Sequence, residues 1–171
     1  QSRAVLQGAA EGILVADLES RSFRYANPTI CKMLGYTARE LRALGVVDIH
    51  PAEHLDEVVA TFDAQARGDL VVARNLPVRR KDGSVLHADI TTTKVRYDGE
   101  DCNVGFFLDV TDRWEAEKAL QQSEQKARRI LDASPMGIHI YRLEEDDRLV
   151  FIGANEAADR ILGVACDAFL G

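Results

Sequence analysis

Residues 70–110 decide the fold, because they contain three runs rich in β-branched and apolar residues: LVVARNLPVRR (70–80), VLHADITTTKVRY (85–97) and NVGFFLDV (103–110). The segments KDGS (81–84) and DGED (98–101) separate them. Asp-Gly between two such runs is the strongest short-range signal for a β-hairpin. We therefore expect three antiparallel strands joined by two tight turns.

Two shorter strands precede this region, at 12–16 and 23–26, with a polar turn between them. Asn27-Pro28 then predicts the start of a helix that ends at Gly35. The Asn side chain can accept from the free amides of a first helical turn, and Pro at the first position gives up a donor that has no partner there. Residues 12–35 are thus predicted to be a hairpin followed by a capped helix.

Further helices are predicted at 37–44, where Thr37 and Glu40 have the spacing of a capping box, and at 52–67. Two strands, several helices and three long strands indicate an α+β domain. We expect a five-stranded antiparallel sheet with the helices on one face.

The segment 109–114 (DVTDRW) joins the last strand to a helix predicted over 111–134, which contains no Gly or Pro. Small and apolar residues recur in this helix with the heptad spacing of a two-helix coiled coil, which we call the seam. They are Ala116, Leu120, Ser123, Ala127, Ile130 and Ser134. The seam buries little, so a solvated linker helix is the alternative. We expect five residues to relay a signal into this helix: Asp109, Thr111, Asp112, Arg113 and Trp114.

The end of the chain repeats its beginning. Gly12-Ile13 recurs 125 residues later as Gly137-Ile138, and Ala26-Asn27 recurs 128 residues later as Ala154-Asn155. Such self-similarity indicates a tandem array. The predicted organisation is an N-terminal amphipathic helix (1–11), a complete domain (12–110), a linker helix (111–134) and the truncated start of a second domain (135–171).

Composition excludes several classes of function. The net charge of −7 argues against nucleic-acid binding, which needs a basic surface. No apolar run approaches the ~20 residues that span a bilayer. The widely spaced Cys31, Cys102 and Cys166 indicate neither a disulfide framework nor a zinc site. We expect a protein of the cytoplasm, where thiols stay reduced.

Metal or catalytic chemistry is not predicted. His50 and His54 are four residues apart, but Pro51 places His50 at or before the start of the helix, so the two rings need not share a face. An enzyme that used Cys31 with either histidine would lack a recognisable third group to orient them. A hydrogen-bonding role is the better prediction for His50.

Several stretches together resemble the PAS sensory-domain family of bacterial signalling proteins. They are Gly12-Ile13, Tyr25-Ala26-Asn27-Pro28, Met33-Leu34-Gly35-Tyr36, Asp48-Ile49-His50-Pro51, the segment 79–84 (RRKDGS) and the segment 109–113 (DVTDR). The resemblance covers residues 1–113 and, in truncated form, 130–171. It implies a small-ligand pocket between the sheet and the helices, and helical linkers that dimerise. It also implies an output domain in the same chain, such as a histidine kinase or a diguanylate cyclase.

The resemblance predicts no cofactor. The flavin branch of the family needs a Cys in an Asn-Cys-Arg motif, and residues 37–55 contain no Cys. The haem branch supplies a His from the helix before the third strand, and residues 62–70 contain no His. We therefore expect an unidentified small ligand in place of haem or covalent flavin.

The candidate pocket residues are polar and apolar side chains that one alternation of the strands would bring together beside the helices. They are Met33, Val59, Phe62, Arg74, Leu76, His87, Asp89, Thr91 and Phe107. A few polar groups in an apolar cavity are what a small-molecule site requires. The alternative is that the polar set simply faces solvent, as one face of an antiparallel sheet often does.

The predicted function is a regulatory module that binds a small ligand and signals through a homodimer, formed by the N-terminal and linker helices, to an output domain. The runner-up is a ligand-free dimerising spacer in a tandem array.

Overall fold

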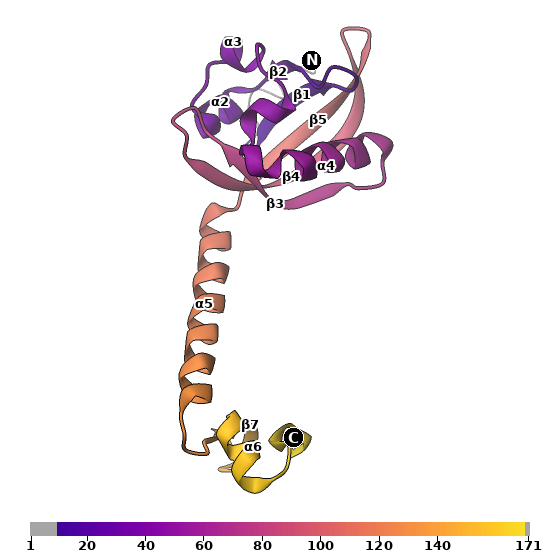
Figure 1. Ribbon diagram of the computed structural model, residues 1–171. Helices are drawn as coiled ribbons and strands as arrows, with labels where there is room; N and C mark the ends of the chain where they lie inside the picture. The colour runs from indigo at the N-terminus through magenta and orange to yellow at the C-terminus, as the bar shows by residue number, and fades with distance from the viewer. Residues whose placement is uncertain (1–9, 170–171) are drawn as a thin grey trace. The chain divides into compact units, whose positions relative to one another are not determined.

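The computed structural model describes residues 10–169, and it divides the chain into two compact units, 1–114 and 115–171. The first unit contains a five-stranded antiparallel sheet in the order β2-β1-β5-β4-β3 (Figure 1). Its strands are β1 (Gly12–Asp17), β2 (Phe23–Ala26), β3 (Val72–Arg79), β4 (Val85–Tyr97) and β5 (Glu100–Asp109). The predicted five-stranded antiparallel sheet is confirmed.

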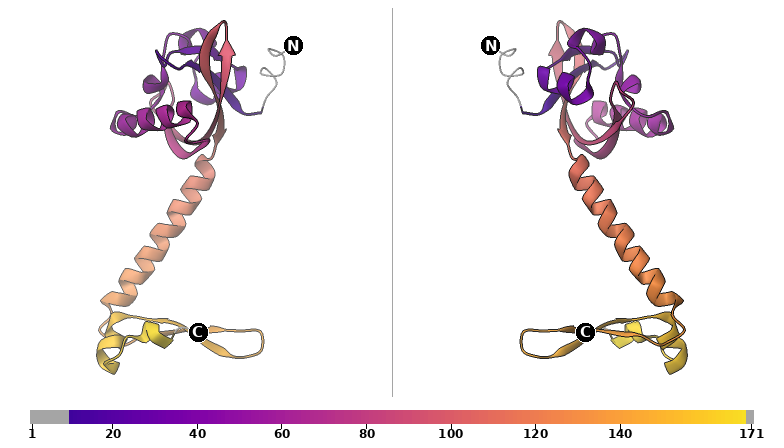
Figure 2. Two further views of the ribbon diagram at one scale, coloured as in Figure 1. Left: turned by 90° about the vertical axis from the view of Figure 1, so that its right-hand side faces the viewer. Right: turned by 90° about the vertical axis from the view of Figure 1, so that its left-hand side faces the viewer.

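The helices of this unit lie against one face of the sheet (Figures 1 and 2). They are α2 (Pro28–Leu34), α3 (Ala38–Leu41) and α4 (Leu55–Arg67), with 3-10 turns at Val46–Ile49 and Ala52–His54. Two boundaries differ from the prediction. The helix expected over 37–44 ends at Leu41, and the helix expected from residue 52 becomes α-helical only at Leu55.

The β4–β5 turn has the geometry that its sequence predicts. Asp98 and Gly99 have φ values of 49° and 85°, and Tyr97 pairs directly with Glu100. Two central residues with positive φ are the mark of a type I′ turn, whose twist matches that of the flanking strands. Strand β5 therefore begins at residue 100, three residues before the predicted start.

Asn27 ties the β1–β2 hairpin to α2. Its side-chain oxygen accepts from the backbone amides of Ile13 (2.8 Å) and Ile30 (2.9 Å), and its side-chain nitrogen donates to the carbonyl of Glu11 (3.0 Å). The residue is completely buried. Gly12 brings the strand close to the helix, since a Cβ there would lie 2.7 Å from the Ile30 side chain.

The main core lies between the sheet and the helices, and includes Leu14, Ile30, Leu34 and Ile90. A smaller cluster lies on the opposite face of the sheet and contains Ile13, Val15, Cys102 and Val104. Alternate residues of β1 thus serve the two clusters, as the period of a strand requires. The whole of β1 is buried on both faces.

The second unit repeats the first part of the fold. After α5 (Thr111–Ala133) come β6 (His139–Leu143), β7 (Leu149–Ala154), α6 (Glu156–Leu162) and a 3-10 turn at Cys166–Phe169. Asn155 caps α6 and also accepts from the Ile138 amide at 2.8 Å, as Asn27 does for Ile13. The sequence repeat is therefore also a repeat of strands, helix and capping hydrogen bonds.

The helix α5 exposes its predicted seam. Leu120 and Ile130 are 61% and 63% exposed, and no residue of the helix is buried. The helix predicted over 1–11 falls on residues 1–9, which lie outside the described residues, and residues 10 and 11 are not helical. No helix in the described part of the chain is both long and apolar enough to cross a membrane.

Candidate functional site

A cavity of about 50 Å³ lies inside the first unit, between the sheet and α4. Most of its lining is apolar: Leu14, Ala16, Phe23, Val46, Ile49, Val58, Phe62, Leu76, Ile90, Gly105 and Phe107. Five polar residues complete it: His50, Thr61, Gln65, Thr92 and Asn103. The arrangement is that of a small-molecule site, a mainly apolar space with a few polar groups.

Among the buried polar residues of the lining, Asn103 on β5 is the one whose side chain makes no hydrogen bond to the described residues. It is 2% exposed, and neither its amide oxygen nor its amide nitrogen has a hydrogen-bond partner among the described residues. Its Cα partner on β1 is Ala16, whose small side chain leaves room on the cavity side. A buried unpaired amide costs free energy, so this one is a candidate ligand contact.

His50 and Gln65 are held by the protein itself. The His50 Nδ1 lies 2.6 Å from the carbonyl oxygen of Pro77, which can only accept, so Nδ1 carries the proton. Burial lowers the pKa of His50, and the ring is neutral near pH 7. The Gln65 side chain donates to the carbonyl of Ile90 at 3.0 Å. The predicted hydrogen-bonding role of His50 agrees with this geometry.

Three of the nine predicted pocket residues line the cavity, namely Phe62, Leu76 and Phe107. Met33 is partly buried against the main core but does not line the cavity. Val59 follows Val58 on α4, and it is Val58 that lines the cavity. One residue along a helix turns the side chain by about 100°, and Val59 lies outside the lining that Val58, Thr61, Phe62 and Gln65 of α4 form.

The other four predicted pocket residues do not line the cavity, because the strand register places them elsewhere. Ile90 pairs with Phe107, so it is Ile90 and Thr92 of β4 that face the cavity, while His87, Asp89 and Thr91 occupy the opposite alternation. Arg74 is exposed at an irregularity of β3 between Ala73 and Leu76, where Asn75 has a φ of 55°. This bulge breaks the period of two on which the prediction relied.

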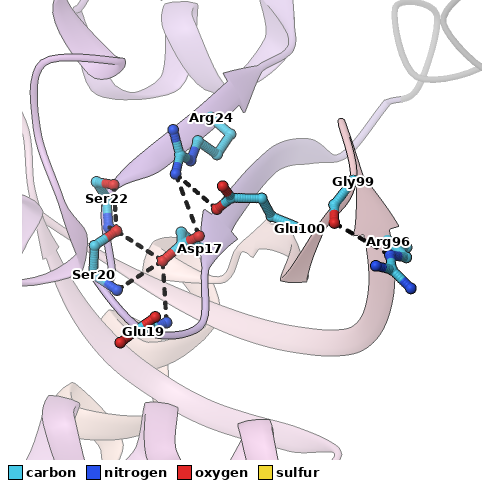
Figure 3. Close-up of polar contacts among 8 residues, drawn as sticks. All are labelled: Asp17, Glu19, Ser20, Ser22, Arg24, Arg96, Gly99 and Glu100. Atoms are coloured by element: carbon cyan, nitrogen blue, oxygen red, sulfur yellow. Dashed lines mark hydrogen bonds and ion pairs between the residues drawn. The ribbon is translucent and has the colours of Figure 1, made fainter.

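A polar cluster around Asp17 stabilises the end of β1 and includes Ser20, Arg24 and Glu100 (Figure 3). One carboxylate oxygen accepts from the Ser20 amide (2.7 Å) and hydroxyl (2.8 Å). The other accepts from Arg24 at 3.4 Å, and Arg24 also donates to Glu100 on β5 at 3.0 Å. The hydrogen bonds from Ser20 hold the pKa of Asp17 far below its ordinary value. The cluster thus links β1, β2 and β5 at the end of β1.

The start of α5 is bonded to β4. The Thr111 hydroxyl accepts from the His87 amide at 3.0 Å, and the Val110 amide donates to the His87 carbonyl at 2.8 Å. The Asp109 carboxylate accepts from the Thr111 amide at 2.9 Å, which gives one free amide of the first turn of α5 a partner. The last strand and the new helix are therefore joined to β4 on both sides of one buried residue, Val110.

Side chains strengthen this junction. The His87 and Trp114 rings stack with their centroids 3.6 Å apart and their planes 11° from parallel. Arg113 donates to Asp89 at 3.0 Å, and the other Asp89 oxygen accepts from the Asn75 amide at 2.9 Å. Four of the five predicted relay residues, Asp109, Thr111, Arg113 and Trp114, thus take part in contacts of the junction, mostly with β4 or with one another. Arg113 also donates to Asn75 on β3 at 3.3 Å, and Asp109 forms an ion pair with Arg80 at 3.8 Å.

Acidification is expected to loosen the junction. Burial alone would raise the pKa of Asp89, but hydrogen bonds from Asn75 and Arg113 outweigh it and hold the pKa below its ordinary value. An acid of this kind stabilises the fold above its ordinary pKa near 3.9, and that contribution is lost as the pH falls through its lower folded pKa. Trp114 is the chain's single tryptophan, so its fluorescence reports on the junction. We expect its emission to change below about pH 4.

Two variants separate Asp89 from the other acids. Asp89→Asn should remove that part of the acid-induced change in Trp114 emission. Asp82→Asn should not, although hydrogen bonds from Ser84 also lower the pKa of Asp82, because Asp82 lies in the β3–β4 turn. Identical titrations of the wild type and Asp89→Asn would contradict the assignment.

Asn103, Gln65, Thr61 and Thr92 were not among the predicted pocket residues. The sequence did contain a signal for Asn103, because this amide has apolar neighbours on both sides. Cys102 precedes it, and the run 104–108 follows it. Among the described residues, no three His, Cys, Asp or Glu side chains are grouped so that they could hold a metal ion.

Comparison with known proteins gives one family. A family model described as PAS domain matches residues 10–112. No curated protein matches the chain. A PAS domain from Desulfitobacterium hafniense is similar in structure, with 24% identity over 62% of this chain and 98% of that one and a TM-score of 0.57.

Two further solved structures have the same fold. A domain of a sensory box sensor histidine kinase/response regulator from Geobacter sulfurreducens has 24% identity over 63% of this chain and 90% of that one, with a TM-score of 0.53. A sensory box histidine kinase/response regulator from Burkholderia thailandensis has 23% identity over 75% and 98%, with a TM-score of 0.58.

Proposed function

Because the chain belongs to the PAS domain family, whose members are non-catalytic sensory modules, we propose that it binds a small ligand in the cavity and passes a signal through α5. The observation that supports this proposal is that strand β4 contributes residues both to the cavity and to the contact with the start of α5. Ile90 and Thr92 line the cavity, while His87 and Asp89, on the opposite alternation of the same strand, contact the start of α5. A ligand that displaces β4 would therefore displace the helix.

Transmission beyond the junction requires a second copy of α5. The exposed Leu120 and Ile130 belong to the heptad-like series in this helix, and apolar residues at such spacing pack against a partner helix. We propose that two copies of the chain pair along this series. The signal would then reach an output domain, a histidine kinase or a diguanylate cyclase in the cytoplasm, through the second unit, which we interpret as the start of a second PAS domain. The solved histidine kinase relatives support the first of these outputs.

The alternative function is a dimerising spacer without a ligand. The small volume of the cavity, about 50 Å³, favours it, because pockets for drug-sized ligands measure roughly 300–1,000 Å³. Native mass spectrometry of the purified chain distinguishes the two functions. A bound small molecule supports the sensor, and an empty dimer supports the spacer.

The junction provides a direct test of transmission. Thr111→Val keeps the shape of the side chain but removes the hydroxyl, which accepts from the His87 amide and donates to the Asp109 carboxylate. The bond that protects the His87 amide is worth about 1 kcal/mol. We expect hydrogen exchange of the His87 amide to accelerate about fivefold, by that free energy, while ligand binding is unchanged. In a fusion to a histidine-kinase output module, the ligand response should fall.

Thr111→Ser is the matched control, because it keeps the hydroxyl. It should exchange and signal like the wild type. A full ligand response in Thr111→Val would show that the hydroxyl contact between α5 and β4 does not carry the signal.

A further inference from the structure

The cavity contains an amide whose two polar atoms are both unused. The Asn103 side chain offers one donor and one acceptor side by side, in a residue that is 2% exposed. A carboxamide has the same pair of groups in the complementary order along one edge. Two such edges can form a cyclic pair of hydrogen bonds, so another amide gives each of the two polar atoms of the Asn103 side chain a partner.

The rest of the lining restricts the ligand to an uncharged molecule. No Asp, Glu, Lys or Arg lines the cavity, and His50 is neutral, with its Nδ1 proton bonded to Pro77. Lys94 is the Cα partner of Asn103 on β4, but it is exposed and does not contribute to the lining. An ion would lose its hydration without gaining a counter-charge.

Size and apolar surface define the remainder of the ligand. At about 50 Å³ the cavity is much smaller than the ~150 Å³ cavity that holds a benzene molecule. Gly105 faces the cavity without a side chain, and a Cβ there would lie 3.0 Å from the Phe107 ring. The space beside the amide is therefore apolar and fits a group of one or two carbon atoms.

We infer that the cavity binds a small neutral primary carboxamide, whose amide edge pairs with Asn103 and whose short alkyl group lies among the apolar residues. The inference rests on the proposed function, since it names the class of ligand for the same cavity. Ordered water is the competing occupant, because a polar site needs only ~10–15 Å³ for each molecule.

Acetamide and acetone are the probes that separate these occupants. They have the same shape and number of heavy atoms, but acetone has a methyl group where acetamide has its donor. In ¹⁵N-labelled full chain, we expect acetamide to shift the Asn103 side-chain and Gly105 backbone resonances saturably, at millimolar concentration, and acetone not to do so. Equal responses to the two probes, or no response to acetamide, would overturn the inference.

Variants test whether the response comes from Asn103. Asn103→Leu should weaken acetamide binding about 30-fold, the loss of two hydrogen bonds. Gly105→Ala should also weaken it, by reducing the space while Asn103 stays in place. Lys94→Gln is the control and should bind like the wild type. Acetamide shifts that persist in both Asn103→Leu and Gly105→Ala would overturn the inference.

The Trp114 indole resonance distinguishes this inference from the proposed function. Saturable acetamide binding that leaves Trp114 unmoved supports the ligand class and contradicts transmission through the junction. A Trp114 response to a molecule other than an amide, with no acetamide binding, overturns the ligand class and leaves the sensor proposal intact.

Discussion

Replacing Asn27 with alanine is expected to lower the free energy of unfolding of the first unit by about 3 kcal/mol, because three backbone groups lose their partner. The side chain is completely buried and serves the Ile13 and Ile30 amides and the Glu11 carbonyl. The first of these amides belongs to β1 and the second to α2. The substitution therefore removes the helix cap and the connection of that helix to the sheet together.

Urea unfolding followed by Trp114 fluorescence measures this effect, because Trp114 is the single tryptophan and lies in the first unit. Asn155→Ala is the matched control. It removes the same cap from α6 in the second unit and should leave the unfolding of the first unit unchanged. A loss below about 1 kcal/mol in Asn27→Ala would mean that water replaces the amide at this site.

Inserting one alanine between Gln121 and Gln122 is expected to abolish the ligand response of a histidine-kinase fusion. The insertion turns everything after it by about 100° relative to the start of α5. The part of the series after the insertion, Ser123, Ala127, Ile130 and Ser134, would then be turned by about 100° from Ala116 and Leu120 before it, and the proposed pairing of two helices would be interrupted. The helix itself should persist, because every residue around the insertion is exposed and alanine favours helix.

A seven-residue insertion at the same place is the control. Seven residues complete two turns to within ~20°, so the face is preserved although the helix is about 10 Å longer. We expect this variant to respond to ligand. If the one-residue variant also responded, rotational register in α5 would not carry the signal, and the helix would act only as a spacer.

The fold was predictable from sequence where a local signal has one physical meaning. Asp98-Gly99 predicted its turn because positive φ at two successive positions suits few residues. Asn27-Pro28 predicted the start of α2 because a helix start needs an acceptor and has no use for one amide proton. The repeat of Asn27 as Asn155 was visible for the same reason, and the structure shows equivalent hydrogen bonds at both.

The residues of the site were only partly predictable, because a strand has two faces and the sequence does not show which of them lines the cavity. His87 and Asp89 are polar and not fully exposed, which is also how pocket residues look, but what they contact is Trp114 and Arg113. The bulge at Asn75 depends on a backbone conformation that residue type does not determine. Asn103 has an amide like many others, and only the absence of a partner in three dimensions makes it a candidate.

Val110 has a mechanical consequence. It is the single residue between the end of β5 and the start of α5, it is 6% exposed, and its amide is bonded to the His87 carbonyl. Connections between helices and strands commonly have about 4–6 residues, so a small displacement of one element can be taken up by the loop. A connection of one residue has almost no conformational freedom to absorb such a displacement. A movement of the end of β5 would therefore also move Thr111, the first residue of α5, which is the first step that the proposed transmission requires.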